Sequence, residues 1–196
     1  PTQLGNASSM TFMRLSENKL TGSIPSSFGN LTQLSRLDLD QNLLTGPIPS
    51  QLGNLTVLKI LHLYDNQLTG SIPTTFGNLI NLETLNIFTN QLSGILPVEL
   101  AQCIQLKHLE VAENLLTGTL PIAYQSLVNL EIFQINNNSF TGPVPIEYLA
   151  WTNIKELYMS TNQIDAIPTF PPALITKLAV ENNNLDFGDL ESNIGT

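Results

Sequence analysis

The chain has 196 residues, of which 42% are hydrophobic and only 12% are charged, and its formal net charge is -9. Seven Lys and Arg stand against sixteen Asp and Glu, which argues against a nucleic-acid partner because phosphate binding depends on clustered cations. No stretch of the sequence approaches the ~18 consecutive apolar residues of a membrane-spanning helix. We therefore expect no membrane insertion by this chain. The single cysteine excludes an internal disulfide framework.

A repeat of 24 residues organises the chain, and its clearest marker is a recurring Asn. An apolar residue follows each Asn by two positions, and two more precede it by five and three, as Leu37 and Leu39 precede Asn42. Such self-similarity is typical of a solenoid, in which each repeat packs on its neighbours. The recurring residues are Asn18, Asn42, Asn66, Asn90, Asn114, Asn138, Asn162 and, after a shorter spacing, Asn183.

The segment before each Asn predicts a short strand, because the L-x-L alternation places Leu inward and the intervening residues toward solvent. Beyond the strand the chain must turn into the interior, where a polar backbone group without a partner costs about 1–3 kcal/mol. An Asn side chain both donates and accepts hydrogen bonds. We therefore interpret the Asn series as a structural ladder between stacked turns, not as a binding group.

The second half of each repeat has Gly four residues and Pro seven residues after the Asn, as in LTGSIP at 20–25 and LTGPIP at 44–49. Gly suits a turn and Pro an extended path. The full pattern resembles the plant-specific class of leucine-rich repeats, found in receptor-kinase ectodomains, polygalacturonase-inhibiting proteins and plant-like bacterial surface proteins. The resemblance implies an α/β repeat solenoid, a right-handed superhelix with a parallel concave β-sheet and short 3₁₀ or β segments on the convex side.

The two ends of the chain depart from the period. Pro1 aligns with Pro25, so the first of about eight repeats in residues 1–185 is truncated, and we expect the chain to be part of a larger protein. Residues 186–196 abandon the repeat and predict a C-terminal cap or the start of a following region. The DFG at 186–188 has none of the other kinase motifs beside it and is interpreted as coincidence.

Few residues have the pattern of a reactive site. Cys103 occupies a position that is Leu in other repeats, which predicts a buried hydrophobic residue instead of a nucleophile. His62 and His108 face outward two repeats apart; Asp38 is one strand from His62, but no third metal ligand is evident. We therefore predict a protein without enzyme activity, cofactor or metal.

Four N-x-[ST] sequons begin at Asn6, Asn30, Asn54 and Asn137. Two of them arise from the GNLT repeat consensus itself, so repetition explains part of the count. They would carry glycans in a eukaryotic secreted protein and have no such meaning in a bacterial one.

The variable residues of the strands form columns across the predicted concave face. Residues six, four, two and one before each Asn are expected to be exposed, on a strip about 34 Å long at ~4.8 Å per strand. Aromatic residues of adjacent repeats, ringed by polar groups, have the composition of a binding hot spot. The alternative is cross-strand pairing that stabilises the sheet by ~0.2–1 kcal/mol per pair. The candidate ligand-binding residues are Asp38, Asp40, Ile60, His62, Tyr64, Asp65 and Phe88.

These columns hold eight acidic and three basic residues, which favours a basic protein or peptide partner. The leading hypothesis is a non-catalytic recognition module that binds protein or peptide on its concave face, within a larger secreted or cell-surface protein. Two alternatives stay open. The same face would bind an oligosaccharide in an adhesion or glycosidase-inhibitor module, or the chain would be a structural spacer in a long surface protein.

Overall fold

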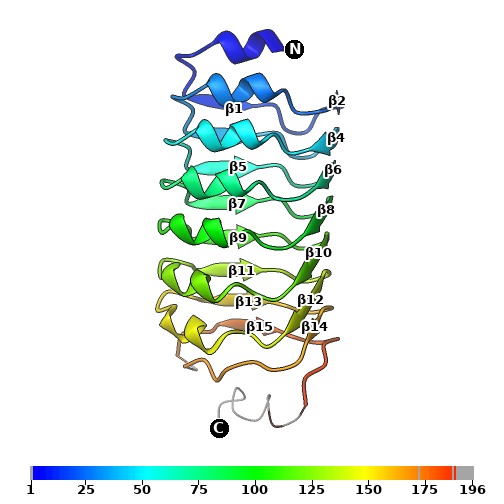
Figure 1. The fold of residues 1–196 in the computed structure, drawn as a ribbon, viewed down its shortest axis with the longest axis vertical. Helices are drawn as coiled ribbons and strands as arrows, with labels where there is room; N and C mark the ends of the chain where they lie inside the picture. Colours follow the sequence, from blue (N-terminus) through cyan, green and yellow to red (C-terminus); the bar gives the residue numbers. More distant parts are fainter. Residues whose placement is uncertain (1, 172, 187, 189–196) are drawn as a thin grey trace.

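A computed structural model describes residues 2–171, 173–186 and 188 of the chain. The backbone winds into a solenoid in which each full turn contributes a concave strand, a second short strand and a 3₁₀ helix (Figure 1). The turns stack in chain order from the N-terminus to the C-terminus, so residues 24 apart become spatial neighbours.

In the part of the chain that the structure describes, the concave face is a parallel sheet of eight strands in chain order. Its register pairs equivalent positions of successive repeats, for example Arg14 with Asp38 and Asp38 with His62. The columns expected from the sequence are therefore rows of adjacent side chains. The strands are β1 (Phe12–Arg14), β3 (Arg36–Asp38), β5 (Ile60–His62), β7 (Thr84–Asn86), β9 (His108–Glu110), β11 (Ile132–Gln134), β13 (Glu156–Tyr158) and β15 (Lys177–Ala179).

Within the described ranges, a second parallel sheet of seven short strands runs along one side of the solenoid, at the right-hand edge of Figure 1. Gly46 and Gly118 lie in or at the end of these strands with φ of 74° and 82°, a region that favours Gly. The strands are β2 (Thr21–Gly22), β4 (Leu43–Pro47), β6 (Gln67–Gly70), β8 (Gln91–Gly94), β10 (Leu115–Gly118), β12 (Ser139–Gly142) and β14 (Gln163–Ile164).

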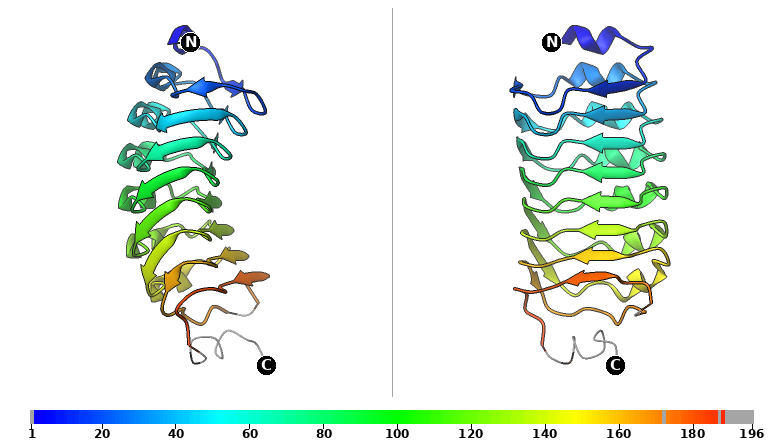
Figure 2. Two further views of the ribbon diagram at one scale, coloured as in Figure 1. Left: turned by 90° about the vertical axis from the view of Figure 1, so that its right-hand side faces the viewer. Right: turned by 180° about the vertical axis from the view of Figure 1, so that it is seen from behind.

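Short 3₁₀ helices lie on the outer side of the curve, opposite the concave sheet (Figure 2). This arrangement confirms the predicted solenoid with its concave parallel sheet and its short 3₁₀ and β segments. No helix in the described ranges has both the length and the apolar character needed to cross a membrane. The helices are η1 (Thr2–Asn6), η2 (Ser26–Asn30), η3 (Ser50–Asn54), η4 (Thr74–Asn78), η5 (Val98–Gln102), η6 (Ile122–Ser126) and η7 (Ile146–Ala150).

One continuous core fills the coil, with the L-x-L leucines such as Leu37 and Leu61 fully buried. Cys103 is also fully buried; its Sγ lies 3.2 Å from the carbonyl oxygen of Phe76, to which it donates, and burial raises the pKa of the thiol to about 12. Toward the C-terminus, Trp151 occupies the position of Leu31, Leu55 and Leu79 in earlier repeats, and its ring stacks on that of Tyr148 at 4.0 Å. The Cys103 thiol therefore has the environment of a core residue, without the exposure or low pKa of a nucleophile.

The Asn side chains lie where the concave strands end and bond to two successive turns. Nδ2 of Asn114 donates to the carbonyl oxygens of Ile87, Val111 and Ala112, and its Oδ1 accepts from the Leu92 amide at 2.9 Å. The residue before each Asn adopts a left-handed conformation, with φ from 50° to 57°. The same bonding to the preceding turn is made by Asn42, Asn66, Asn90, Asn138, Asn162 and Asn183.

Apart from Asp186 and Gly188, the segment 186–196 lies outside the described residues. Its role as a cap or as the start of a following region stays a prediction, and so does the boundary at residue 185.

Candidate functional site on the concave face

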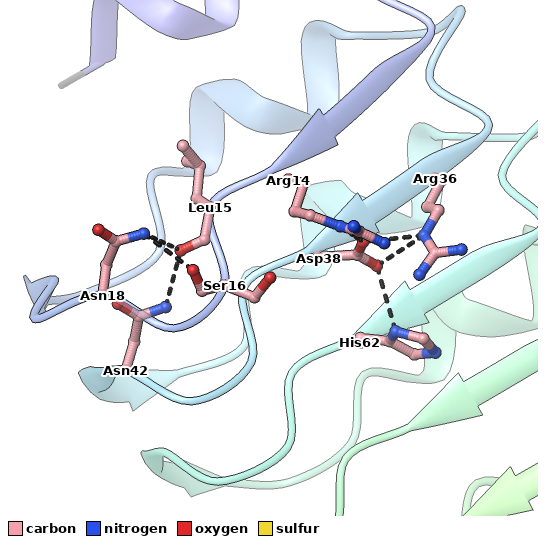
Figure 3. A network of polar contacts seen from close by, with 8 residues as sticks. All are labelled: Arg14, Leu15, Ser16, Asn18, Arg36, Asp38, Asn42 and His62. Atoms are coloured by element: carbon pink, nitrogen blue, oxygen red, sulfur yellow. Dashed lines mark hydrogen bonds and ion pairs between the residues drawn. The ribbon is translucent and has the colours of Figure 1, made fainter.

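Asp38 lies at the centre of a polar cluster that joins the first three concave strands (Figure 3). Nε of Arg36 donates to both carboxylate oxygens at 3.0 and 2.8 Å, and Nε of Arg14 donates to Oδ2 at 3.0 Å. Nδ1 of His62 is 3.2 Å from Oδ1. Because these partners come from β1, β3 and β5, the Asp38 cluster ties three successive turns together.

The expectation that the strand residues two and four before each Asn are exposed is wrong for Asp38 and Asp40, which are only 1% and 5% exposed. Asn86, at the position equivalent to Asp38 two turns later, is also buried. A carboxylate leaves water only where partners compensate its charge. The guanidinium groups of Arg14 and Arg36 supply that compensation and separate the Asp38 carboxylate from solvent.

Two arginines of the cluster were absent from the predicted site. Both guanidinium groups lie over the ring of Phe12, with centroid distances of 5.7 Å for Arg14 and 5.9 Å for Arg36, which is cation–π geometry. The repeat register already placed Arg14 beside Asp38, and Arg36 lies two residues before Asp38 on the same strand. The sequence therefore contained the information for these ion pairs with Asp38. They become apparent only when the charges of neighbouring strand positions are compared.

The expectation that no third ligand lies near Asp38 and His62 is also wrong, because Asp40 supplies one. Ligand atoms of Asp38, Asp40 and His62 all lie within 4.8 Å of one another, and two carboxylates with an imidazole are a donor set that metals use. However, Asp38 already accepts charge-assisted bonds from two guanidinium groups, which an incoming cation would have to displace. The group is therefore best described as an ion-pair network that holds the strands.

Aromatic residues continue the site toward the next strand. The rings of Tyr64 and Phe88 stack 4.7 Å apart at an interplanar angle of 13°, and His62 meets Tyr64 edge-on at 5.9 Å. Burial, followed by the hydrogen bond to Asp40, raises the pKa of Tyr64 to about 12. The hydroxyl therefore stays protonated at neutral pH and is available to donate to Asp40.

Contacts thus link four of the seven candidate residues in the order Asp38, His62, Tyr64, Phe88. Asp40 lies beside Asp38 and His62 and influences the pKa of Tyr64. Ile60 is half-buried at the start of β5, and Asp65 is exposed with a φ of 54° just beyond the strand. Both belong to the same turn as His62 and Tyr64. The structure brings the set together around one turn of the solenoid.

An acidic region adjoins the aromatic pair on the C-terminal side. Glu110 accepts from Nδ2 of Asn86 at 3.0 Å, and burial, reinforced by the charge of Glu156, raises its pKa. Glu156 is neutralised in part by Lys177 at 3.0 Å. Glu113 is exposed on the same side, and Asp65 is exposed on the turn of Tyr64. From the N-terminal to the C-terminal end of the solenoid, the concave face therefore carries first the arginines of β1 and β3, then the aromatic pair, and then acidic residues.

The free energy of unfolding is expected to fall on acidification because of His62. Burial is the main cause that lowers the pKa of His62 below 6.5, although Asp38 opposes it. Because the unfolded chain then takes up the proton first, stability is lost as the pH falls through 6.5 toward the folded-state pKa. Urea unfolding of the wild type and His62→Gln, compared between about pH 7.5 and pH 5, measures this. A His62 contribution that grows at low pH would contradict the prediction.

Family models identify repeats across the first part of the chain. A model described as leucine rich repeat matches residues 9–31 and 33–55, and a second model with the same description matches residues 56–116. Together these ranges cover more than half of the 196 residues. No curated protein sequence matches the chain.

Solved structures include close structural matches. The plant peptide hormone receptor RGFR1 in complex with RGF2 is 34% identical, with a TM-score of 0.92 over 98% of this chain and 32% of that chain. The Arabidopsis receptor kinase HAESA, solved with the peptide hormone IDA and the co-receptor SERK1, is 32% identical, with a TM-score of 0.88 over 94% and 32% of the two chains.

A leucine-rich repeat protein of Leptospira interrogans is 27% identical, with a TM-score of 0.77 over 97% of this chain and 54% of that one. The chain spans about a third of the plant receptor structures that it matches. The repeat matches and the shared architecture of two parallel sheets with 3₁₀ turns agree. The chain therefore belongs to the leucine-rich repeat family and is a plant-like member of it.

Proposed function

We propose that the chain is a non-catalytic recognition module that binds a peptide or protein segment across its concave face. The stacked pair of Tyr64 and Phe88 carries this proposal. The two rings are half-buried and stack on each other at 4.7 Å, and hydrogen bonding to Asp40 contributes, after burial, to the raised pKa of Tyr64. Rigid aromatic side chains near the centre of a surface are typical of binding hot spots, because little entropy is lost when they meet a partner.

The charges around the pair favour a ligand with basic side chains. Asp65 and Glu113 are exposed next to the aromatic region, and Glu110 accepts a bond from a neutral amide. Asp38, by contrast, is already compensated by arginine. A Lys or Arg of the ligand would therefore find its complement on the C-terminal side of Phe88.

The similar plant receptor structures support a peptide ligand, since two of them were solved with peptide hormones bound. This chain corresponds to about a third of each of those receptors. We accordingly propose an extracellular location and a place within a longer receptor-like protein. Non-catalytic function is supported by the same likeness and by the burial of Cys103.

The ring geometry favours a peptide over an oligosaccharide. A sugar stacks on the open face of an aromatic ring, whereas Tyr64 and Phe88 each commit one face to the other ring. A spacer function would leave the aromatic pair without a task beyond sheet stability, which such pairs increase by only ~0.2–1 kcal/mol. These two alternatives are outcomes of the test below.

The double substitution Tyr64→Ala and Phe88→Ala is expected to weaken peptide binding by about 30-fold or more, because each hot-spot truncation costs about 2 kcal/mol when effects are not fully additive. The probe is a synthetic peptide selected from a random display library on the wild-type chain. Isothermal titration calorimetry gives the affinity, and a glycan array is screened in parallel with both proteins. Circular dichroism checks that the variant keeps its fold.

The matched control is Ile80→Ala with Ile104→Ala, which removes two exposed apolar side chains after the 3₁₀ helices η4 and η5. It should leave the affinity unchanged. Equal binding by the Tyr64/Phe88 variant and the wild type would refute the site. Selective oligosaccharide binding that the variant loses would replace the peptide proposal with the carbohydrate one.

A further inference from the structure

A column of exposed aliphatic side chains runs along the outer side of the solenoid, away from the concave face. Val98, Ile122 and Ile146 are the first residues of η5, η6 and η7 and are 53%, 55% and 67% exposed. These three helices belong to successive turns, so the side chains are neighbours in space. We call this set the aliphatic column.

The aliphatic column is not required for folding. The equivalent first positions of η2, η3 and η4 are Ser26, Ser50 and Thr74, all exposed. The same backbone therefore accepts a small hydroxyl residue at this point in three turns and presents a large aliphatic one in the next three. Scattered exposed apolar residues need no explanation, but a contiguous set marks an interaction site.

A shallow hollow beside the column adds apolar surface. It has a volume of about 630 Å³, and its lining includes Ile95, Val98, Thr119 and Glu99. Ile95 is 63% exposed and lies against Gly118, where an added Cβ would come within 2.8 Å of the Ile95 Cγ2. The hollow adjoins the Val98 end of the column and extends toward the preceding turn, where Ser71, Ile72 and Thr74 line it.

The charge of this surface indicates which kind of partner would be complementary to it. Residues 91–106, 115–130 and 139–154, which form the outer side of these turns, contain two carboxylates and no Lys or Arg. Glu99 and Glu147 each follow a column residue directly. A second copy of the chain would bring like charges together, which opposes association, whereas a partner with basic residues beside an apolar stripe would be complementary.

The spacing of the column selects the shape of the partner. Neighbouring concave strands lie ~4.8 Å apart, and the outer side of a curved solenoid is wider. Side chains on one face of an α-helix are about 5–6 Å apart at i and i+4, while those on one face of a strand are about 6.6 Å apart. A helix that lies along the solenoid axis can therefore place successive side chains of one stripe on successive turns of the column.

We propose that the aliphatic column docks an amphipathic α-helix of a partner protein, with the helix's apolar stripe on Val98, Ile122 and Ile146 and its Lys or Arg residues beside Glu99 and Glu147. This mode uses the general physics of an amphipathic helix on an apolar surface. The helices η5, η6 and η7, which begin with these three residues, lie opposite the concave sheet (Figure 2). It is therefore independent of the peptide site around Tyr64 and Phe88.

Two synthetic helical peptides of about 18 residues test the proposal. They share one Leu stripe and differ only in having Lys or Glu beside it. The Lys peptide should bind the wild-type chain more tightly than the Glu peptide by about tenfold or more, and added salt should weaken its binding. The triple variant Val98→Ser, Ile122→Ser and Ile146→Thr should lose about tenfold or more of the affinity.

The control variant is Ile80→Thr, Ile104→Thr and Val128→Thr. It removes three exposed aliphatic side chains that follow η4, η5 and η6, where other turns have Thr32, Thr56 and Thr152. No carboxylate is next to them in the chain, unlike the column residues Val98 and Ile146. It should bind the Lys peptide like the wild type, as should Tyr64→Ala with Phe88→Ala. Equal loss in the two triple variants, equal binding of the two peptides, or a wild-type dimer that the first triple variant abolishes would each overturn the proposal.

Discussion

Replacing Asn114 with Ala is expected to lower the free energy of unfolding by about 3–4 kcal/mol, because buried polar backbone groups would lose their partner. The Leu92 amide and the carbonyl oxygens of Ile87, Val111 and Ala112 all bond to this side chain. Asn114 is only 7% exposed, so water does not replace the amide freely. Urea unfolding followed by circular dichroism measures the loss.

Asn18 provides a matched control within the same ladder. It is exposed, and the described hydrogen bonds of its side chain reach only the carbonyl oxygens of Leu15 and Ser16 in its own turn (Figure 3). Asn18→Ala should therefore cost about 1 kcal/mol or less. Equal losses for the two variants would contradict a ladder in which bonds between turns carry the stability.

Replacing Gly53 with Ala is expected to destabilise the chain by about 2–3 kcal/mol through overpacking. A Cβ at this position would lie 2.5 Å from the carbonyl oxygen of Thr75 and 2.6 Å from its Cβ. Both contacts involve the next turn, so relief requires that η3 and η4 move apart. Thermal and urea unfolding of the variant measure the effect.

The control is Ala101→Gly, since Ala101 occupies the equivalent position in η5. The backbone at η5 already accommodates a Cβ, so removing it should change stability by less than about 1 kcal/mol. If Gly53→Ala were neutral, the turns would be free to separate, and the close approach of η3 to η4 would not limit the packing.

The 24-residue repeat predicted the solenoid because the same sequence pattern recurs in every turn. Once Asn42 and Asn66 are equivalent, their flanking leucines must share one interior and the strands must pair in register. That is why the parallel concave sheet and its rows follow from the sequence. The donor and acceptor of the Asn amide likewise suffice to predict its place at the turn.

Two features of the turns could not be predicted from the sequence. The residue before each ladder Asn has a φ between 50° and 57°, yet Glu17, Thr89 and Asn137 share no side-chain preference for that conformation. The bonds of the Asn impose it on whichever residue is present. The tight approach at Gly53 was equally hidden, because repetition shows that a Gly recurs and not what it touches.

The sequence alone determined which residues lie side by side on the concave face, since the register is a property of the backbone. Only the tertiary structure decided how those neighbouring side chains interact. Two arginines form ion pairs with Asp38, which is therefore not free to bind a ligand, and the rings of Tyr64 and Phe88 stack instead of pointing apart. Several rotamers satisfy one register, and the choice among them depends on the charge, size and burial of every adjacent side chain at once.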